Sequence, residues 1–429
     1  MIQPIRTSAS QMPIERRVDP SDGSVAETVA NIVRDIRERG DEALLSYTKT
    51  FDGVELEKAN LQCSLAEQKK AAQNVDTQMK KVMEEAAANI RAYHERALPK
   101  NWFMTTDQGA VLGQKQTPID SVGIYIPAGS APLASSVLMT AIPAKVAGVQ
   151  RIVVASPPDT EGQMNEGILA ACAVAGVDEV YKMGGAQAIA AFAYGTESVP
   201  KVDKIVGPGN IYVATAKKQV YGDVDIDMFA GPSEIVIAAD EQVVSPRVVA
   251  ADLLSQAEHD PLASAILLTT SEPFATQVAE ELESQVSRLP RESVARASLE
   301  SYGGLYVLES LDEVVQAINK IAPEHLELMV KDPYACLDRI RHAGAIFIGP
   351  YSAESVGDYF AGPSHVLPTN GTARFSSPLS VEDFMKRTSI IHYSEEALQA
   401  NASSIAEFAR LEELEAHARA VEVRMEEKS

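Results

Sequence analysis

The sequence predicts an α/β protein whose parallel sheets are covered by helices on both faces. Six short runs of β-branched and apolar residues lie between about residues 120 and 350, and segments with helical periodicity separate them. Runs this short and this apolar are typical of buried strands. Strands that alternate with helices form parallel sheets, because each helix returns the chain to the end of the sheet where the previous strand began.

The expected strands are, in chain order, residues 151–155, 204–206, 234–239, 265–268, 305–308 and 345–348. The first hundred residues differ from the rest, since they are mostly helical in pattern. Apolar residues recur with the helical period from Val29 to Ile36, and Gly40 ends that expected helix. A second, long helix is expected from Glu67 to Arg96, and a shorter amphipathic one begins at Ser310.

Length, charge and cysteine content exclude several classes of protein. A chain of 429 residues is long enough for roughly two or three domains. Its 60 acidic residues outnumber the 38 Lys and Arg, and the net charge of −22 argues against a nucleic-acid partner or a membrane surface. No apolar stretch is long enough to span a bilayer, and no signal peptide is visible. Cys63, Cys172 and Cys336 form no CxxC pair, so we expect buried free thiols and a cytoplasmic protein.

A carboxylate and an imidazole stand on adjacent residues in Pro323-Glu-His-Leu-Glu327, in a chain with only seven histidines. Glu324 and His325 therefore suggest acid–base chemistry, since an unperturbed imidazole has a pKa of about 6.5 and can take up a proton near neutral pH. The pattern alone leaves a second interpretation open, in which Glu324 ends a helix beside a surface His325.

Gln256 and His259 are three residues apart and would share one face of a helix, which turns about 100° per residue. Together with Asp358 and His417 they offer an amide oxygen, two imidazoles and a carboxylate. This mixed set suits zinc or a neighbouring divalent ion. Because no HExxH or CxxC motif is present, ordinary core or capping histidines remain an alternative.

Two glycine-rich turns, at Gly184 and at Gly207, follow strand-like stretches and open helices. Backbone N–H groups at such helix starts can bind a phosphate or a carboxylate. Tyr125 stands at an expected strand end before Pro127, where its ring could stack on a nucleotide. A complete GxGxxG motif is absent, so plain strand-to-helix turns and a core tyrosine are the alternatives.

Seven longer motifs occur in the order found in histidinol dehydrogenases. They are Ile124-Tyr-Ile-Pro127, Gly184-Gly-Ala-Gln-Ala-Ile-Ala190, Val199 to Asn210, Ala230-Gly-Pro-Ser-Glu234, Leu253 to His259, Pro323 to Glu327 and Ala361 to Thr369. The chain resembles this family from about residue 25 to 420. One departure is Ala128, which stands where the family usually has the first glycine of a Pro-Gly-Gly turn.

The resemblance implies zinc-dependent oxidation of L-histidinol through L-histidinaldehyde to L-histidine, with reduction of two NAD, as the last step of histidine biosynthesis. It implies one zinc per subunit in a homodimer whose active site is shared between subunits. It assigns zinc to Gln256, His259, Asp358 and His417, and NAD to Tyr125, Gln187 and Asn210. The implied substrate contacts are Ser233, Gln256, His259, Glu324, His325, Asp358, Glu412 and His417, with His365 nearby.

The chemistry itself asks for two bases beside one carbon. Hydride transfer from a primary alcohol requires a base for the hydroxyl proton, a role that suits His325. Oxidation of the aldehyde requires addition of water, and Glu324 can take that water's proton. We therefore expect both residues to be catalytic.

The resemblance also implies two similar, incomplete Rossmann-like domains with small N- and C-terminal helical segments. The expected divisions are an N-terminal segment 1–24, a catalytic and zinc domain 25–124 plus 235–378, an NAD domain 125–234 and a C-terminal dimerisation segment 379–429. The last segment carries a helical apolar stripe that it is too small to bury alone: Ile405, Phe408, Leu411, Leu414, Ala418 and Val421.

Other functions remain compatible with these residues. A related dehydrogenase could oxidise a different primary alcohol. In a zinc hydrolase, Glu324 would activate a metal-bound water, and the nucleotide-site turns would not be needed. A non-catalytic zinc or nucleotide-binding module would not need both candidate bases.

Overall fold

The computed structural model describes residues 2–13, 23–128, 132–177, 179–229 and 231–426. The chain divides into two units, one formed by residues 1–97 and 120–384 and the other by residues 98–119 and 385–429. Each unit is described here by itself. Among the described residues, no helix has the length and apolarity that a membrane span requires.

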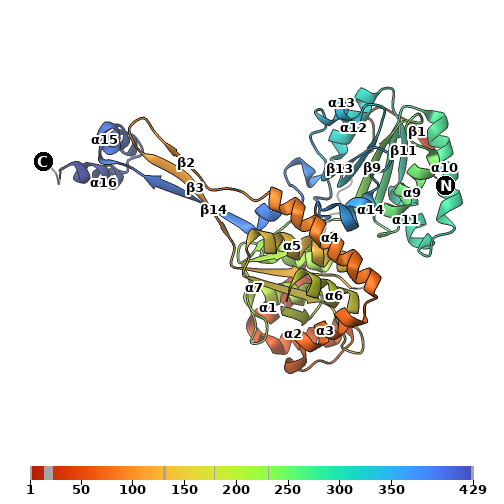
Figure 1. Cartoon of the computed structure of the whole chain (residues 1–429), viewed down its shortest axis with the longest axis horizontal. Helices are drawn as coiled ribbons and strands as arrows, with labels where there is room; N and C mark the ends of the chain where they lie inside the picture. The colour runs from red at the N-terminus through yellow and green to blue at the C-terminus, as the bar shows by residue number, and fades with distance from the viewer. Residues whose placement is uncertain (1, 14–22, 129–131, 178, 230, 427–429) are drawn as a thin grey trace. The chain divides into compact units, whose positions relative to one another are not determined.

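The first unit contains two parallel sheets, and helices lie on both sides of each (Figure 1). One sheet, called sheet B, has the spatial strand order β6-β5-β4-β7-β8. Its strands are β4 (Ser121–Tyr125), β5 (Arg151–Ser156), β6 (Glu179–Lys182), β7 (Lys204–Val206) and β8 (Asp225–Ile226). The helices between them are α5 (Ala134–Ala147), α6 (Glu166–Ala175), α7 (Gly185–Tyr194) and α8 (Ile211–Val220).

The second sheet, called sheet A, has the order β1-β11-β10-β9-β12-β13. Its strands are β1 (Pro4–Arg6), β9 (Glu234–Ala239), β10 (Ser264–Thr269), β11 (Gly304–Val307), β12 (His325–Met329) and β13 (Ala345–Ile348). The helices that follow β9 are α9 (Pro246–Ala257), α10 (Glu272–Val286), α11 (Glu292–Tyr302), α12 (Leu311–Ile321), α13 (Pro333–Leu337) and α14 (Glu354–Val356). A single turn of π-helix, η3 (Gly357–Ala361), continues α14.

Apart from the edge strand β1 of sheet A, both sheets place their first strand in the middle, the next two on one side and the last two on the other. This is the strand order of a Rossmann fold without its sixth strand, so the expectation of two similar, incomplete Rossmann-like domains is confirmed. In β9, Ile235 and Ile237 pack with α9 and α10, whereas Val236 and Ala238 pack with α12. This alternation buries both faces of the strand and explains its uninterrupted apolar sequence.

The N-terminal helices pack on sheet B. They are α1 (Gly23–Arg39), α2 (Asp41–Tyr47), α3 (Leu65–Asn74) and α4 (Thr77–Arg96), with a π-helical turn η1 (Thr48–Asp52) and a short 3₁₀ turn η2 (Lys58–Asn60) between α2 and α3. Helix α1 packs against α7 and α8, α3 against α6, and α4 against α5. The resemblance implied one domain made of residues 25–124 and 235–378, which contains most of sheet A. In the structure, apolar residues of α1 and α2 instead share a core with sheet B, and β4 belongs to that sheet.

Two further expectations about the N-terminal half need correction. The long helix expected from Glu67 to Arg96 is two helices, because the carboxylate of Asp76 accepts hydrogen bonds from the N–H groups of Gln78 and Met79 and starts α4 afresh. The N-terminal segment was expected to be helical, yet Pro4–Arg6 form β1, which pairs with β11 at the edge of sheet A. By contrast, Gly40 ends α1 with a positive φ of 53°, as predicted.

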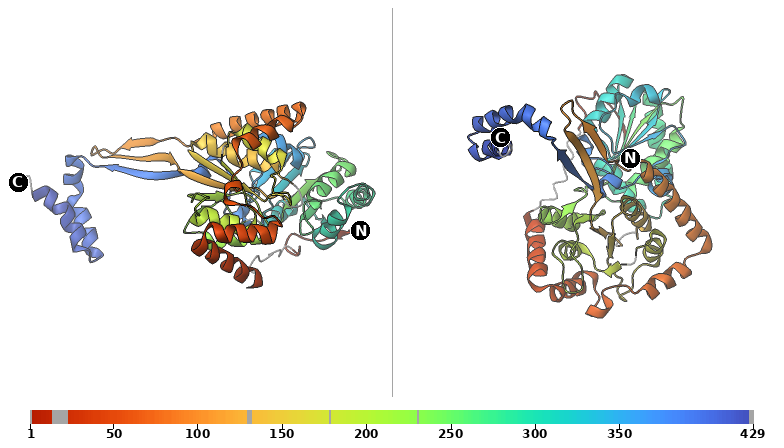
Figure 2. Two further views of the ribbon diagram at one scale, coloured as in Figure 1. Left: turned by 90° about the horizontal axis from the view of Figure 1, so that it is seen from below. Right: turned by 60° about the vertical axis from the view of Figure 1, so that its left-hand side comes forward.

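The second unit consists of an antiparallel ribbon and two helices. Its elements are β2 (Trp102–Thr105), β3 (Val111–Pro118), β14 (Met385–His392), α15 (Glu395–Leu411) and α16 (Glu415–Glu426). β3 lies between β14 and β2, and the two helices pack on each other (Figure 2). The predicted apolar stripe does not lie on one helix, because the chain turns at Glu413, whose φ is 61°. Phe408 and Leu411 remain 65% and 77% exposed.

Candidate active site

The predicted acid–base pair lies at the amino ends of the strands of sheet A. His325 is the first residue of β12 and stands in register with Ile235 of β9 and Ala345 of β13. Glu324 directly precedes it, and both side chains are buried. The interpretation of this pair as a helix-end carboxylate beside a surface imidazole is therefore wrong. Gln256 lies in the last turn of α9, which leads toward the start of β10.

The hydrogen bonds of His325 fix where its proton sits. Its Nδ1 lies 3.2 Å from the carbonyl oxygen of Glu234, which can only accept, so Nδ1 carries hydrogen. Nε2 is buried and has no hydrogen-bond partner among the described residues, and it lies 3.7 Å from Oδ1 of Asp358. In the neutral ring, Nε2 therefore presents a free lone pair, as a general base requires.

Burial and neighbouring carboxylates shift the pKa values of both candidate bases. Burial raises the pKa of Glu324 to about 8. Its Oε2 accepts the N–H of Glu234 at 2.8 Å, which fixes the carboxyl group in place. Burial lowers the pKa of His325, but the charges of Glu354, Glu324 and Asp358 outweigh burial and raise it to about 10. A cation bound among these carboxylates would oppose that rise and favour the neutral imidazole.

A group of potential metal ligands surrounds this pair. His259, Glu354 and Asp358 each offer one ligand atom, and these atoms lie within 4.8 Å of one another. His259 is exposed and follows the end of α9, where its N–H donates to the carbonyl of Gln256 at 3.2 Å. The two residues were predicted to share one face of a helix. Gln256 does lie on α9, but His259 lies just beyond it, and the turn that ends the helix keeps the two residues adjacent. An imidazole with carboxylates and an amide oxygen fits a zinc ion.

Glu354 is the member of this group that the sequence analysis missed. It begins α14, and its side chain is 2% exposed. A signal was available, because Glu354 and Asp358 are four residues apart and share one face of a helical turn. Sequence alone could not separate this pair from the many exposed acidic pairs of an acidic chain.

More buried carboxyl groups lie behind the ligands. Glu327 is fully buried, and its Oε1 accepts the N–H of Glu354 at 2.9 Å. Burial, followed by the charge of Asp252, raises the pKa of Glu327 to about 9. Burial likewise raises the pKa of Glu354 to about 7. So many buried acids leave the region short of positive charge, which a divalent cation would supply.

Two other predicted residues border this region. His365 bridges elements, since its Nδ1 lies 3.0 Å from the carbonyl of Asp358 and its Nε2 3.0 Å from the hydroxyl of Ser136 in α5. Ser233 immediately precedes Glu234 and is half-buried. The structure thus gathers Gln256, His259, Glu324, His325, Asp358 and His365 around the amino ends of sheet A.

The predicted nucleotide-site residues lie instead at the carboxyl ends of sheet B. Tyr125 ends β4, and its hydroxyl accepts the N–H of Gly185 at 3.1 Å. Gln187, in the first turn of α7, is 1% exposed, and neither its amide nitrogen nor its oxygen has a partner among the described residues. Asn210 caps α8 and is exposed. Buried unpaired amide atoms of this kind fit a site that a polar ligand completes.

The middle of sheet B is where an open α/β sheet usually binds its ligand. The strand order reverses between β4 and β7, and Tyr125 and Gly207 stand at that point. Gly207 has a φ of 114°, and an added Cβ would lie within 2.1 Å of the carbonyl oxygen of Tyr125. Ala128 is not among the non-glycine residues with positive φ in the described part of the chain, and Gly129 lies outside that part.

Glu412 and His417 belong to the second unit. Glu412 ends α15 and His417 lies in the first turn of α16. The ligand group of the first unit is built without them, and their membership of the site stays a prediction.

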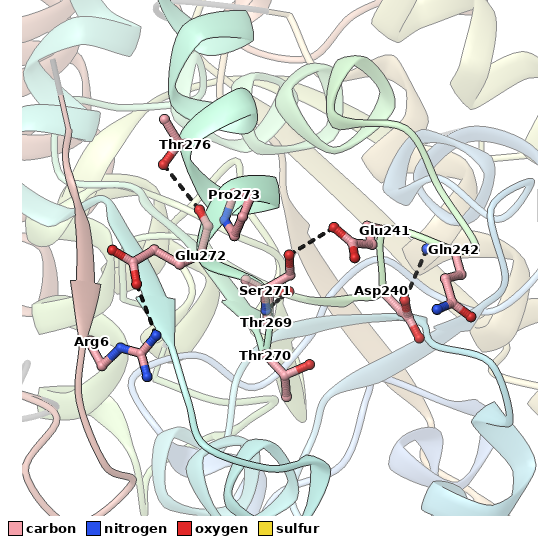
Figure 3. A pocket seen from close by; sticks show the side chains of 10 residues that line it. All are labelled: Arg6, Asp240, Glu241, Gln242, Thr269, Thr270, Ser271, Glu272, Pro273 and Thr276. Carbon is pink, nitrogen blue, oxygen red and sulfur yellow. Dashed lines mark hydrogen bonds and ion pairs between the residues drawn. The ribbon is translucent and has the colours of Figure 1, made fainter.

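A concave surface also exists at the opposite, carboxyl ends of sheet A, with a volume of about 690 Å³. Figure 3 shows that its polar side chains bond to one another: Arg6 to Glu272, Ser271 to Glu241 and the N–H of Gln242 to Asp240. No predicted site residue lines it. The candidate chemistry is therefore not centred on this surface.

Comparisons with known proteins show the family of the chain. A family model described as histidinol dehydrogenase matches residues 15–425. A histidinol dehydrogenase of Geobacillus kaustophilus is 56% identical over 96% of this chain and 97% of its own length, and one of Halalkalibacterium halodurans is 53% identical over 99% of both. The crystal structure of histidinol dehydrogenase from Elizabethkingia anophelis superimposes with a TM-score of 0.93 at 38% identity, covering 99% of this chain and 98% of that one. The chain is therefore an enzyme of the histidinol dehydrogenase family.

Proposed function

We propose that this enzyme oxidises L-histidinol to L-histidine through L-histidinaldehyde, with zinc bound and with two NAD reduced, as the last step of histidine biosynthesis. The observation that carries the proposal is the free, buried Nε2 of His325 beside a buried Glu324 and the ligand group around Asp358. A dehydrogenase that makes an acid needs both bases at one carbon.

Zinc held by Gln256, His259, Asp358 and His417 would orient the imidazole and amino groups of the substrate, and NAD resting on Tyr125, Gln187 and Asn210 would accept hydride. His325 takes the hydroxyl proton at Nε2 in the first oxidation. Glu324 takes a proton from the water that adds to the aldehyde in the second. Ser233 and Glu412 complete the proposed substrate contacts. Burial of both bases excludes bulk water from their reactive atoms.

The proposed division of labour gives NAD binding to residues 125–234 and catalysis to sheet A. We further propose a homodimer in which the segment 379–429 brings Glu412 and His417 to the partner's site. The exposed apolar side chains of α15 support this, since Phe408 and Leu411 find no cover within the described chain. Free, buried Cys63, Cys172 and Cys336 are consistent with action in the reducing cytoplasm.

Formation of NADH on addition of L-histidinol tests the reaction. Two NADH should appear for each histidinol consumed, and a panel of other primary alcohols should react far more slowly. Absence of NADH formation is the result expected of a zinc hydrolase, and one NADH per substrate would limit the enzyme to the first oxidation. For the shared site, mixing inactive His417→Asn and His259→Asn variants should restore activity after subunit exchange, since a hybrid dimer holds one complete site.

A further inference from the structure

We propose that Glu354 is a positioning residue that orients the side-chain amide of Gln256 and leaves the amide oxygen free to bind the metal. The proposal rests on the zinc site of the proposed function. It adds a residue outside the four assigned ligands, and it states how that residue acts.

The two ends of an amide are alike in shape but opposite in hydrogen bonding, so their environment decides which way they point. Gln256 is fully buried. With its nitrogen toward Glu354, it donates to Oε1 at 3.2 Å and to Oε2 at 3.3 Å. The opposite orientation would set the amide oxygen against two carboxylate oxygens, which only accept when ionised. The carboxylate of Glu354 therefore selects one orientation of the amide.

This selection matters because only one amide atom binds metals well. The nitrogen lone pair is delocalised into the carbonyl group, whereas the oxygen is a good ligand for a divalent ion. When Glu354 holds the nitrogen, the oxygen is the atom that remains available. A partner that fixes a ligand's orientation in this way typically contributes tenfold to a hundredfold in metal affinity.

Glu354 is itself held firmly enough to act as such a partner. Its side chain is 2% exposed, and its backbone N–H donates to Oε1 of Glu327 at 2.9 Å. Glu327 lies two residues beyond His325 in β12, so sheet A anchors the turn that carries Glu354. Glu354 thus connects the orientation of a ligand to the strand that begins with His325.

The test measures zinc affinity by competition with a chromogenic chelator, using Zn²⁺ itself and the full-length protein. Glu354→Met keeps the side-chain length but removes the acceptor, and it should weaken zinc binding about tenfold to a hundredfold. Glu354→Gln keeps an acceptor oxygen without the charge, and it should stay within about threefold of the parent. In a Gln256→Ala background, Glu354→Met should cause no further loss, because its effect acts through that amide. Circular dichroism confirms folding, and Glu354→Ala replaces Glu354→Met if the latter does not fold.

Two outcomes would overturn the proposal while leaving the proposed function intact. If Glu354→Gln weakens binding as much as Glu354→Met, the charge acts directly on the metal. If the losses from Gln256→Ala and Glu354→Met add, Glu354 acts independently of the amide. Failure of the parent protein to bind zinc at all would instead remove the proposed function and this inference together.

Discussion

The two sheets of the first unit share one topology, yet their candidate site residues lie at opposite ends. In sheet B, Tyr125 and Asn210 stand where strands end and helices begin. In sheet A, Glu324 and His325 stand where a strand begins, and Gln256 lies where a helix ends. Strand order alone therefore does not locate function, which depends on the side chains placed at each end.

The direction of the helices offers a physical reason for this difference. Helix amino termini carry partial positive charge and meet the carboxyl ends of the strands, so that end of sheet B suits the phosphates of a dinucleotide. Helix carboxyl termini carry partial negative charge and meet the amino ends of the strands. The end of α9, together with the buried carboxylate of Glu354 and the half-buried carboxylate of Asp358, makes that end of sheet A suitable for a cation.

Removal of metal is the strongest challenge to this comparison. If the amino end of sheet A holds the essential zinc, chelation should abolish turnover, and added zinc should restore it. Elemental analysis and NADH formation measure the two quantities on the same samples. Full activity of protein shown to be metal-free would mean that the cluster of His259, Glu354 and Asp358 has another purpose.

Substitution of the two bases tests the chemistry at this end of the sheet. His325→Asn should slow both oxidations by about a hundredfold to ten-thousandfold, since it removes the free Nε2. Glu324→Gln should slow oxidation of histidinaldehyde more than that of histidinol, because only the aldehyde step needs water to add. Single-turnover rates with each substrate measure the two steps separately. Equal losses in both steps for Glu324→Gln would end the proposed division between the bases.

Local patterns predicted much of this fold, because strand and helix signals are short-range. Uninterrupted apolar runs located β9 and β7, and Gly40 marked the end of α1. Packing partners were not predictable in this way. The helical spacing of apolar residues predicts that Val29 is buried, but it does not predict the sheet against which Val29 packs. In the structure, Val29 joins the core of sheet B.

The candidate site shows the same difference between residues that short-range patterns reveal and residues that only tertiary contacts reveal. His325 and Gln256 were found through adjacent or helical spacing and the family resemblance. Glu354 was missed because its importance comes from contacts with Gln256, Glu327 and Asp358 rather than from its own sequence neighbours. The break at Asp76 was missed for a simpler reason, since a capping carboxylate inside a polar helix pattern looks like one more surface residue.

A variant in sheet B tests whether NAD and zinc bind at separate sites. Gln187→Ala removes buried amide atoms that lack partners in the protein, so it should raise the dissociation constant for NAD about tenfold. Its affinity for zinc should not change. Titration calorimetry with NAD and chelator competition with zinc measure both constants. His259→Asn is the matched control in sheet A and should show the reverse pattern, and a variant of either sheet that loses both ligands equally would contradict separate sites.

The smallest expected effect is a contribution to the pH dependence of stability from a group behind the site of sheet A. Burial and the charge of Asp252 raise the pKa of Glu327 from 4.5 to about 9, so the folded state favours the protonated carboxyl group. Its contribution to stability is therefore complete below pH 4.5 and is lost as the pH rises toward 9. In metal-free protein, Glu327→Gln keeps the shape of the protonated group, and its melting temperature should fall less than that of the parent between about pH 5 and pH 9, by on the order of a few degrees. Gln187→Ala in sheet B should leave the parent profile unchanged. Parallel profiles for Glu327→Gln and the parent would show that Glu327 titrates as an ordinary carboxyl group.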